Sequence, residues 1–289
     1  MRTAPKKVVN GWAMYDWANS AYSLVITSAI FPAYYTFIAP PQVHFIGRTF
    51  ERSALASYAI SFSFLIIAFL SPILSSIADY KGNKKSFMQF FCYLGSAACI
   101  GLTFLTSENI SFGIVCSIFG SIGFCGSIVF YNAYLPEVAA EEDQDRVSAK
   151  GFAMGYIGSV LLMIVCLAAI MLNDALHWGL GSWPTRLSFL SVGLWWAGFA
   201  QITFKNLPPS TPSQQQPDRS IFVNGFYELK KVWKQLSDYP VTKRFLRSFF
   251  FYNMGVQTVM YLATYFASEE IKMETSQLII TILIIQLVN

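Results

Sequence analysis

The sequence predicts an all-α membrane protein built from several membrane-spanning helices. Of its 289 residues, 54% are apolar and only 12% are charged, whereas about a quarter of the residues in ordinary soluble domains are charged. The charged residues gather in short clusters between apolar runs that are long enough to cross a bilayer. This composition excludes a water-exposed globular domain, and the net charge of +4 gives no indication of a nucleic-acid partner.

Apolar runs predict seven complete spans and a partial eighth. The seven spans cover residues 12–38, 53–77, 86–106, 111–135, 151–172, 185–204 and 245–267. The eighth run starts near Ser276, and its roughly 14 residues would rise roughly 21 Å, which is short of the roughly 30 Å hydrocarbon core. We therefore expect this polypeptide to be part of a longer chain. Basic residues precede the first run, but it continues to Ile38 without a small-residue cleavage site, so we expect an uncleaved span and not a signal peptide.

The distribution of Lys and Arg predicts a cytoplasmic N-terminus. The loops on the N-terminal side of the membrane would hold fifteen basic residues: Arg2, Lys6, Lys7, Lys81, Lys84, Lys85, Arg146, Lys150, Lys205, Arg219, Lys230, Lys231, Lys234, Lys243 and Arg244. The opposite side would hold four: Arg48, Arg52, Arg186 and Lys272. Cytoplasmic loops carry an excess of Lys and Arg. The expected location is a bacterial inner membrane, with lipid around the bundle.

A polar segment divides the chain into two blocks. We expect a six-helix bundle over residues 1–204, a cytoplasmic linker over 205–243 and the start of a second bundle over 244–289. The linker opens with a Pro-, Ser- and Gln-rich stretch that is too polar to pack. Apolar residues then recur at helical spacing among lysines: Phe222, Phe226, Leu229, Trp233 and Leu236. This pattern fits an amphipathic helix on the anionic leaflet or, equally, a short helix packed on the loops.

The first span carries a polar stripe within its apolar sequence. At about 100° per residue, five hydrogen-bonding residues share one arc of the helix: Asp16, Asn19, Ser20, Ser23 and Thr27. A carboxylate that faces lipid costs several kcal/mol, so this stripe must face protein or a wet cavity. Two interpretations follow, a polar cluster that packs helices together or the wall of a solute or proton pathway.

The seventh span weakly repeats the first. Residues 252–257 (YNMGVQ) resemble residues 15–20 (YDWANS) in the order of aromatic, hydrogen-bonding, large apolar and small side chains. Together with the linker, this favours two repeated halves, as in many transporters. At 1.5 Å per residue, Asp16, Asn132 and Asn253 all fall in the cytoplasmic part of the membrane. They predict a polar layer nearer a gate than the midplane.

A charged hinge follows the second span. An acid ends the helix at Asp79, Gly82 allows a tight turn, and Lys84 and Lys85 begin the next helix. This spacing resembles the signature between helices 2 and 3 of the major facilitator superfamily, although Ser75 stands where that signature has its first Gly. The resemblance implies two helical bundles that rock about a central cavity lined by helices 1, 4 and 7. It also implies that this hinge latches the halves in one access state; ordinary loop charge with a turn glycine is the alternative.

A narrower resemblance covers the whole chain. Residues 15–22 (YDWANSAY), 131–137 (YNAYLPE), 148–158 (SAKGFAMGYIG) and 252–258 (YNMGVQT) resemble the vacuole-effluxer, autophagy-related permease family. Many members of that family carry an acid where Met254 stands here. Fungal members are associated with the export of amino acids from the vacuole, which makes amino acids a candidate solute class.

The end of the fourth span and the start of the fifth hold further candidates. Glu137 leaves the membrane after a proline, and an acidic loop follows it. This loop is either solvated or paired with Lys84 and Lys85. The fifth span then carries small residues spaced for close helix packing: Gly151, Gly155 and Gly158.

These observations favour a secondary active transporter of the major facilitator type that moves a small solute, with a proton as the candidate coupling ion. The candidate pathway residues are Tyr15, Asp16, Asn19, Ser20, Ser23, Asn132, Asn253 and Gln257. The candidate cytoplasmic gate consists of Asp79, Gly82, Lys84, Lys85, Glu137 and Arg146. A non-transporting receptor or scaffold on the same fold is the alternative. An enzyme, a cofactor or a metal site is not expected, because we find no nucleophile–base pair, phosphate loop or metal-ligand spacing.

Overall fold

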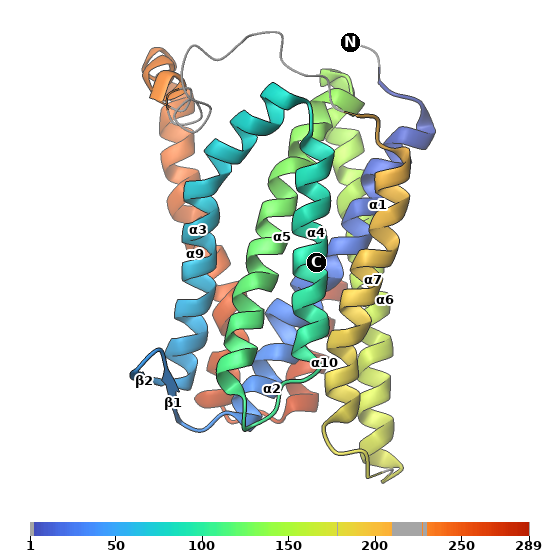
Figure 1. Cartoon of the computed structure of the whole chain (residues 1–289), viewed down its shortest axis with the longest axis vertical. Coiled ribbons are helices and arrows are strands. Elements are labelled where there is room, and N and C mark those ends of the chain that lie inside the picture. Colours follow the sequence, from blue (N-terminus) through green and yellow to red (C-terminus); the bar gives the residue numbers. More distant parts are fainter. Residues whose placement is uncertain (1–2, 178, 210–226, 228–229, 289) are drawn as a thin grey trace.

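In a computed structural model, the chain is a bundle of long helices (Figure 1). The structure describes residues 3–177, 179–209, 227 and 230–288. Within helices, it does not describe the side chains of residues 79–81, 174, 275, 276, 279, 283 and 286–288. About half of the predicted linker, including the start of its predicted amphipathic helix, therefore lies outside the described residues.

The first predicted span is one continuous helix with three parts. It begins as α1 (Lys6–Ala21), widens into a π-helical segment, η1 (Tyr22–Ala29), and ends as α2 (Ile30–Ile38). A π-helix bonds each N–H to the carbonyl five residues earlier and is frequently found at functional sites. We did not predict this change in helix type from the sequence.

Each of the other predicted spans is also a helix. They are α3 (Arg52–Lys81), α4 (Lys84–Leu102), α5 (Ile110–Val138), α6 (Gln144–Ala175), α7 (Trp183–Asn206), α9 (Pro240–Glu269) and α10 (Thr275–Val288). Short 3-10 turns lie at Glu141–Asp143 and Leu236–Asp238. Among the described residues, five helices are long and apolar enough to cross a membrane. These are the α1–α2 helix, α3, α5, α6 and α7. The prediction of an all-α membrane protein is confirmed.

A small β-hairpin that we did not predict joins the first two spans. Strands β1 (Gln42–Phe45) and β2 (Arg48–Glu51) pair antiparallel. The two turn residues, Ile46 and Gly47, both have positive φ angles of 48° and 71°. Turns of this kind match the twist of paired strands and normally carry Asn or Gly at both positions. Because Ile46 occupies the first of these positions, the sequence does not show the usual hairpin pattern.

The bundle has two distinct ends (Figure 1). The end with the N-terminus, the α3–α4 turn and the chain that leaves α7 is called the linker end below. The opposite end, with β1–β2 and the α6–α7 turn, is called the hairpin end. Helix α3 contains Pro72 and bends toward α4 as it approaches the linker end, as expected where proline removes a backbone hydrogen bond.

Helices α1 to α7 form the first block and share one core. Helix α1 packs on α6 and α7, α4 packs on α5 and α7, and α3 packs on α5. Large aromatic side chains fill this core: Trp12, Tyr15, Tyr35, Phe130, Tyr134, Phe189 and Trp196 are all at most 2% exposed. Where α4 and α5 cross, Gly123 packs directly on the backbone of Gly95. The first block is therefore tightly packed where α1, α4, α5, α6 and α7 meet.

Candidate functional site

Asp16 lies where α1, α5 and α6 meet. The Tyr131 hydroxyl of α5 donates a hydrogen bond of 2.7 Å to Asp16 Oδ2. The Trp12 indole donates in turn to the Tyr131 carbonyl at 3.1 Å, and the two rings stack with centroids 4.2 Å apart. On the α6 side, Gly151 leaves no room for a Cβ beside the Asp16 carboxylate and the Tyr131 hydroxyl. Three of the sequence motifs therefore converge on one half-buried carboxylate.

The rest of the polar stripe follows the same seam between α1 and α6. Asn19 is 2% exposed, and within the described part of the chain its Nδ2 has no acceptor. Ser20 donates to Asn19 Oδ1 at 3.4 Å, and Gly155 of α6 packs against it. Tyr15 is fully buried, while Ser23 is half-buried at the start of the π-helical segment. The stripe thus combines a packed seam with an uncompensated amide.

The residues of the candidate gate lie at the linker end. Gly82 ends α3 with a φ of 64°, a left-handed conformation that favours glycine. Lys84 forms an ion pair of 2.7 Å with Glu137 at the end of α5, whereas Glu141 and Glu142 of the acidic loop are exposed. Lys85 donates to the Leu207 carbonyl at 3.0 Å. Arg146 forms a local ion pair of 2.8 Å with Asp143, three residues earlier. The side chain of Asp79, predicted as part of this gate, lies outside the described side chains.

One face of the YNAYLPE motif ties three parts of the first block together. Tyr131 bonds to Asp16 in α1, the Tyr134 hydroxyl donates to the Pro208 carbonyl at 3.2 Å, and Glu137 pairs with α4. Residues three apart lie on the same side of a helix. Asn132 points away from this face and is exposed. The motif therefore holds the chain where it leaves α7.

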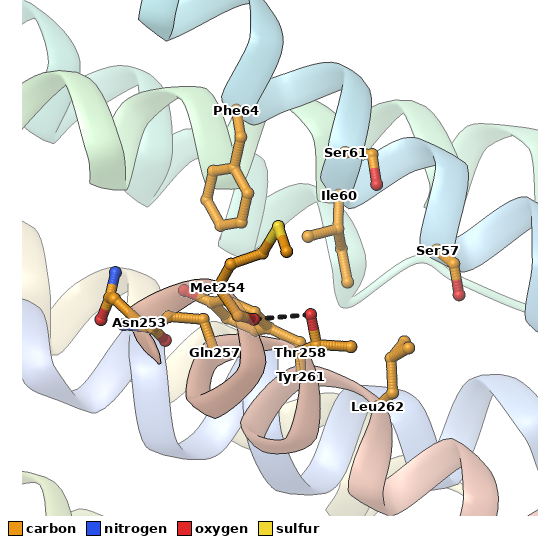
Figure 2. Close-up of a pocket in the computed structure, with 10 residues that line it drawn as sticks. All are labelled: Ser57, Ile60, Ser61, Phe64, Asn253, Met254, Gln257, Thr258, Tyr261 and Leu262. Atoms are coloured by element: carbon orange, nitrogen blue, oxygen red, sulfur yellow. Dashed lines mark hydrogen bonds between the residues drawn. The ribbon is translucent and has the colours of Figure 1, made fainter. Parts of the chain in front are cut away.

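A separate cavity lies between α3 and α9. It has a volume of about 510 Å³, within the usual range of small-molecule sites. Helix α3 contributes Ser57, Ile60, Ser61 and Phe64, and α9 contributes Asn253, Met254, Gln257, Thr258, Tyr261 and Leu262. Figure 2 shows these two sets of side chains on opposite walls. None of the ten described lining residues carries a charge.

The structure brings only two of the predicted pathway residues together in this cavity. Asn253 and Gln257 line it, whereas Asp16 and the rest of the stripe lie on the α1–α6 seam. The similar residues of the first and seventh spans therefore lie at two different places in the molecule, the α1–α6 seam and the cavity. We did not predict the contribution of α3 to this cavity, because Ser57 and Ser61 are isolated polar residues in an apolar run.

Beyond the cavity, α9 closes onto the first block toward the hairpin end. Tyr261, Tyr265 and Glu269 follow one another at four-residue spacing, so they share one face of the helix. They meet Phe64 of α3, with centroids 5.3 Å apart, Tyr35 of α2, with centroids 6.4 Å apart, and Arg52 at the start of α3. Thr264, beside this row, donates to the Ser28 carbonyl of η1.

The sequence analysis did not single out Arg52 or Glu269. Arg52 Nη2 donates to Glu269 Oε2 at 2.8 Å, and Arg52 Nε donates to the other carboxylate oxygen. The only signal in the sequence is that a base and an acid lie at span ends on the same predicted side of the membrane. Since 217 residues separate them, spacing alone cannot pair them.

Comparisons with known proteins place the chain in a family. The family described as "Vacuole effluxer Atg22 like" matches residues 4–289. An uncharacterized MFS-type transporter, YxiO of Bacillus subtilis, is 36% identical over 284 residues, which cover 98% of this chain and 65% of that protein. Autophagy-related protein 22-1 of Aspergillus terreus is 24% identical over 311 residues, covering 81% of this chain and 50% of that protein.

The chain therefore spans about half to two thirds of the length of these relatives. No solved structure matches it significantly. The membrane-length helices, the bundle and the motif residues around Asp16 agree with the match over nearly the whole chain. This integral multi-pass membrane protein belongs to the Atg22-like vacuole effluxer family, and its Bacillus subtilis relative is an MFS-type transporter.

Proposed function

We propose that the protein acts as a secondary active transporter in which a small solute passes between the first block and the helices that begin with α9. The observation that carries this proposal is the cavity between α3 and α9, which α9 closes toward the hairpin end. The residues of α9 near that end contact α2, η1 and α3. Closure of a cavity at one end is one half of an alternating-access cycle.

The loop charges give this state a direction. Lys84, Lys85 and the other linker-end cations predict that the linker end faces the cytoplasm. The closed hairpin end would then face the outside of the cell. A bacterial inner membrane is the location that we propose, since the relative from Bacillus subtilis is bacterial. The paired residues at the linker end would act as the cytoplasmic gate when the cavity closes on that side.

The cavity between α3 and α9 is the proposed solute site. Its amide and hydroxyl groups suit a small solute that forms hydrogen bonds and carries no net charge, because the described wall offers no counter-ion. Amino acids, which are neutral overall as zwitterions, are the first solutes to test. The family's description as effluxers makes export the first direction to measure. Asp16 is the proposed proton-coupling carboxylate.

Counterflow in proteoliposomes that contain the full-length protein tests the proposal. Labelled amino acids and other small neutral solutes would be screened for exchange against the same unlabelled solute inside the vesicles. Asn253→Leu and Gln257→Leu should each lower counterflow roughly five- to tenfold, since each removes a hydrogen bond to the solute. Val259→Leu is the matched control, because Val259 is exposed and lies outside the cavity lining.

Two results would oppose this function. If no solute shows counterflow, the alternative of a membrane receptor or scaffold on the same fold gains support. If counterflow occurs but Asn253→Leu and Gln257→Leu behave like Val259→Leu, the solute passes elsewhere and the cavity is not its site.

A further inference from the structure

We propose that Arg52 and Glu269 form a latch that holds the passage shut at the hairpin end and opens once in each transport cycle. This inference rests on the proposed function, and it assigns the closing of one end to two named residues. The latch joins the two blocks of the chain, since Arg52 begins α3 and Glu269 ends α9.

The contact is a two-pronged ion pair. Both Arg52 Nε and Arg52 Nη2 donate to the Glu269 carboxylate, the latter at 2.8 Å. Fork-shaped pairs of this kind fix orientation as well as adding energy. Both side chains are about one-fifth exposed, at 21% and 20%. Water therefore reaches both charges, and the pair can separate without leaving a charge buried and unpaired.

The two partners are held very differently. Arg52 Nη1 also donates to the carbonyls of Thr36 and Ala39, each at 2.9 Å, at the end of α2. The Arg52 carbonyl accepts a hydrogen bond of 3.0 Å from the Tyr35 hydroxyl. These bonds fix the guanidinium to the first block whether or not Glu269 is present. Glu269 is therefore the moving partner, which α9 carries toward or away from a stationary site.

The neighbouring contacts support closure at the same level of the molecule. Thr264 donates to the Ser28 carbonyl in the π-helical segment, and Tyr265 meets Tyr35 nearly edge-on, at an interplanar angle of 81°. Thr264 and Tyr265 are the two buried residues of α9. The closed end thus consists of a dry aromatic and hydroxyl layer with an ion pair on its outer side. The cavity lies next to this layer, on the side that faces the linker end.

Accessibility of the cavity from each side of the membrane tests the latch without any knowledge of the solute. Ser57 lines the cavity, so Ser57→Cys in the full-length protein serves as a reporter for membrane-impermeant thiol reagents. Labelling is measured in right-side-out and inside-out vesicles. The five native cysteines are free, so the same protein without the reporter gives the background.

Glu269→Gln removes the charge pair but leaves the backbone bonds of Arg52 in place. We expect labelling from the hairpin-end side to become roughly two- to fivefold faster, since loss of a partly exposed pair shifts a two-state equilibrium by about that factor. Glu270→Gln is the matched control: it loses the same charge at the next, exposed position. The exchanged pair Arg52→Glu with Glu269→Arg should recover part of the slow labelling.

Labelling of Glu269→Gln at the rate of Glu270→Gln would overturn the latch. This failure is distinct from failure of the proposed function. Labelling that responds as expected while no solute shows counterflow would keep the latch as the closure of a cavity and remove the transport assignment. Active counterflow with an unresponsive label would do the reverse.

Discussion

The first block and helix α9 differ sharply in how they are held. Within α1 to α7, closely packed glycines, stacked rings and an ion pair join neighbouring helices. Helix α9, in contrast, has 30 residues and buries two of them, both near the hairpin end. Changes inside the first block should therefore act on folding. Changes on α9 should act on the balance between conformations, and the following predictions test this division.

The largest effect should come from Gly123→Ala in α5. A Cβ there would lie 2.5 Å from the backbone nitrogen of Gly95 and 2.7 Å from the Phe91 carbonyl oxygen. Backbone atoms on both sides cannot move aside cheaply, so we expect a loss of about 1–3 kcal/mol or more, seen as a lower melting temperature in detergent and a lower yield.

Gly255→Ala in α9 is the control for that substitution. Among the described atoms, nothing lies within 4 Å of a Cβ at Gly255, and alanine favours a helix by up to about 1 kcal/mol over glycine. Melting temperature should be unchanged or higher. Equal losses for the two variants would break the distinction between the first block and α9.

An intermediate effect is expected for Asp16→Asn. The Tyr131 hydroxyl would keep an acceptor but lose the charge on it, and hydrogen bonds to charged groups contribute about 1.5–3 kcal/mol against about 1 kcal/mol for neutral ones. We expect a modest loss of thermal stability. If Asp16 also couples protons, solute uptake by the full-length protein should lose its dependence on pH.

Tyr131→Phe separates the two roles of Asp16. It removes the hydroxyl and keeps the ring that stacks on Trp12, so it should lower stability by a similar amount while uptake still responds to pH. A pH response that persists in Asp16→Asn would remove Asp16 from the mechanism and leave it as a packing residue.

The smallest effect should come from Thr264→Val. This nearly isosteric change removes the hydrogen bond to the Ser28 carbonyl. The free energy of unfolding should fall by about 0.5–1.5 kcal/mol at most. The expected result is roughly two- to fivefold faster labelling of Ser57→Cys from the hairpin-end side. Thr281→Val is the comparison, because its hydroxyl bonds within α10 to the Gln277 carbonyl at 2.8 Å and Thr281 lies outside the cavity lining.

Hydropathy was sufficient to predict the helices but not how they meet. Every predicted span is a helix, and Gly82 takes the left-handed conformation expected of a turn glycine. The β-hairpin escaped prediction because Ile46 occupies a turn position where glycine or asparagine is usual. Periodicity also assumes a uniform helix, so it could not show where the first span changes its winding.

The candidate site was predictable only in part. The polar stripe was sufficient to predict Asp16 and Asn19 as candidate residues. A single sequence does not say whether α6 or a cavity covers them. Gln257 was found from the weak repeat, while its neighbours Ser57 and Ser61 carry no pattern of their own. Arg52 and Glu269 remained hidden because their pairing depends on how α9 returns to the first block.

The π-helical segment η1 has a consequence for alignment. An extra residue in a helical turn rotates all later side chains about the helix axis. The side chains of Ile30–Ile38 therefore point in different directions from those that a uniform α-helix would give them. Deletion of a single residue between Tyr22 and Ala29 would restore ordinary α-helical winding and rotate Tyr35 away from Tyr265. No single substitution would have this effect.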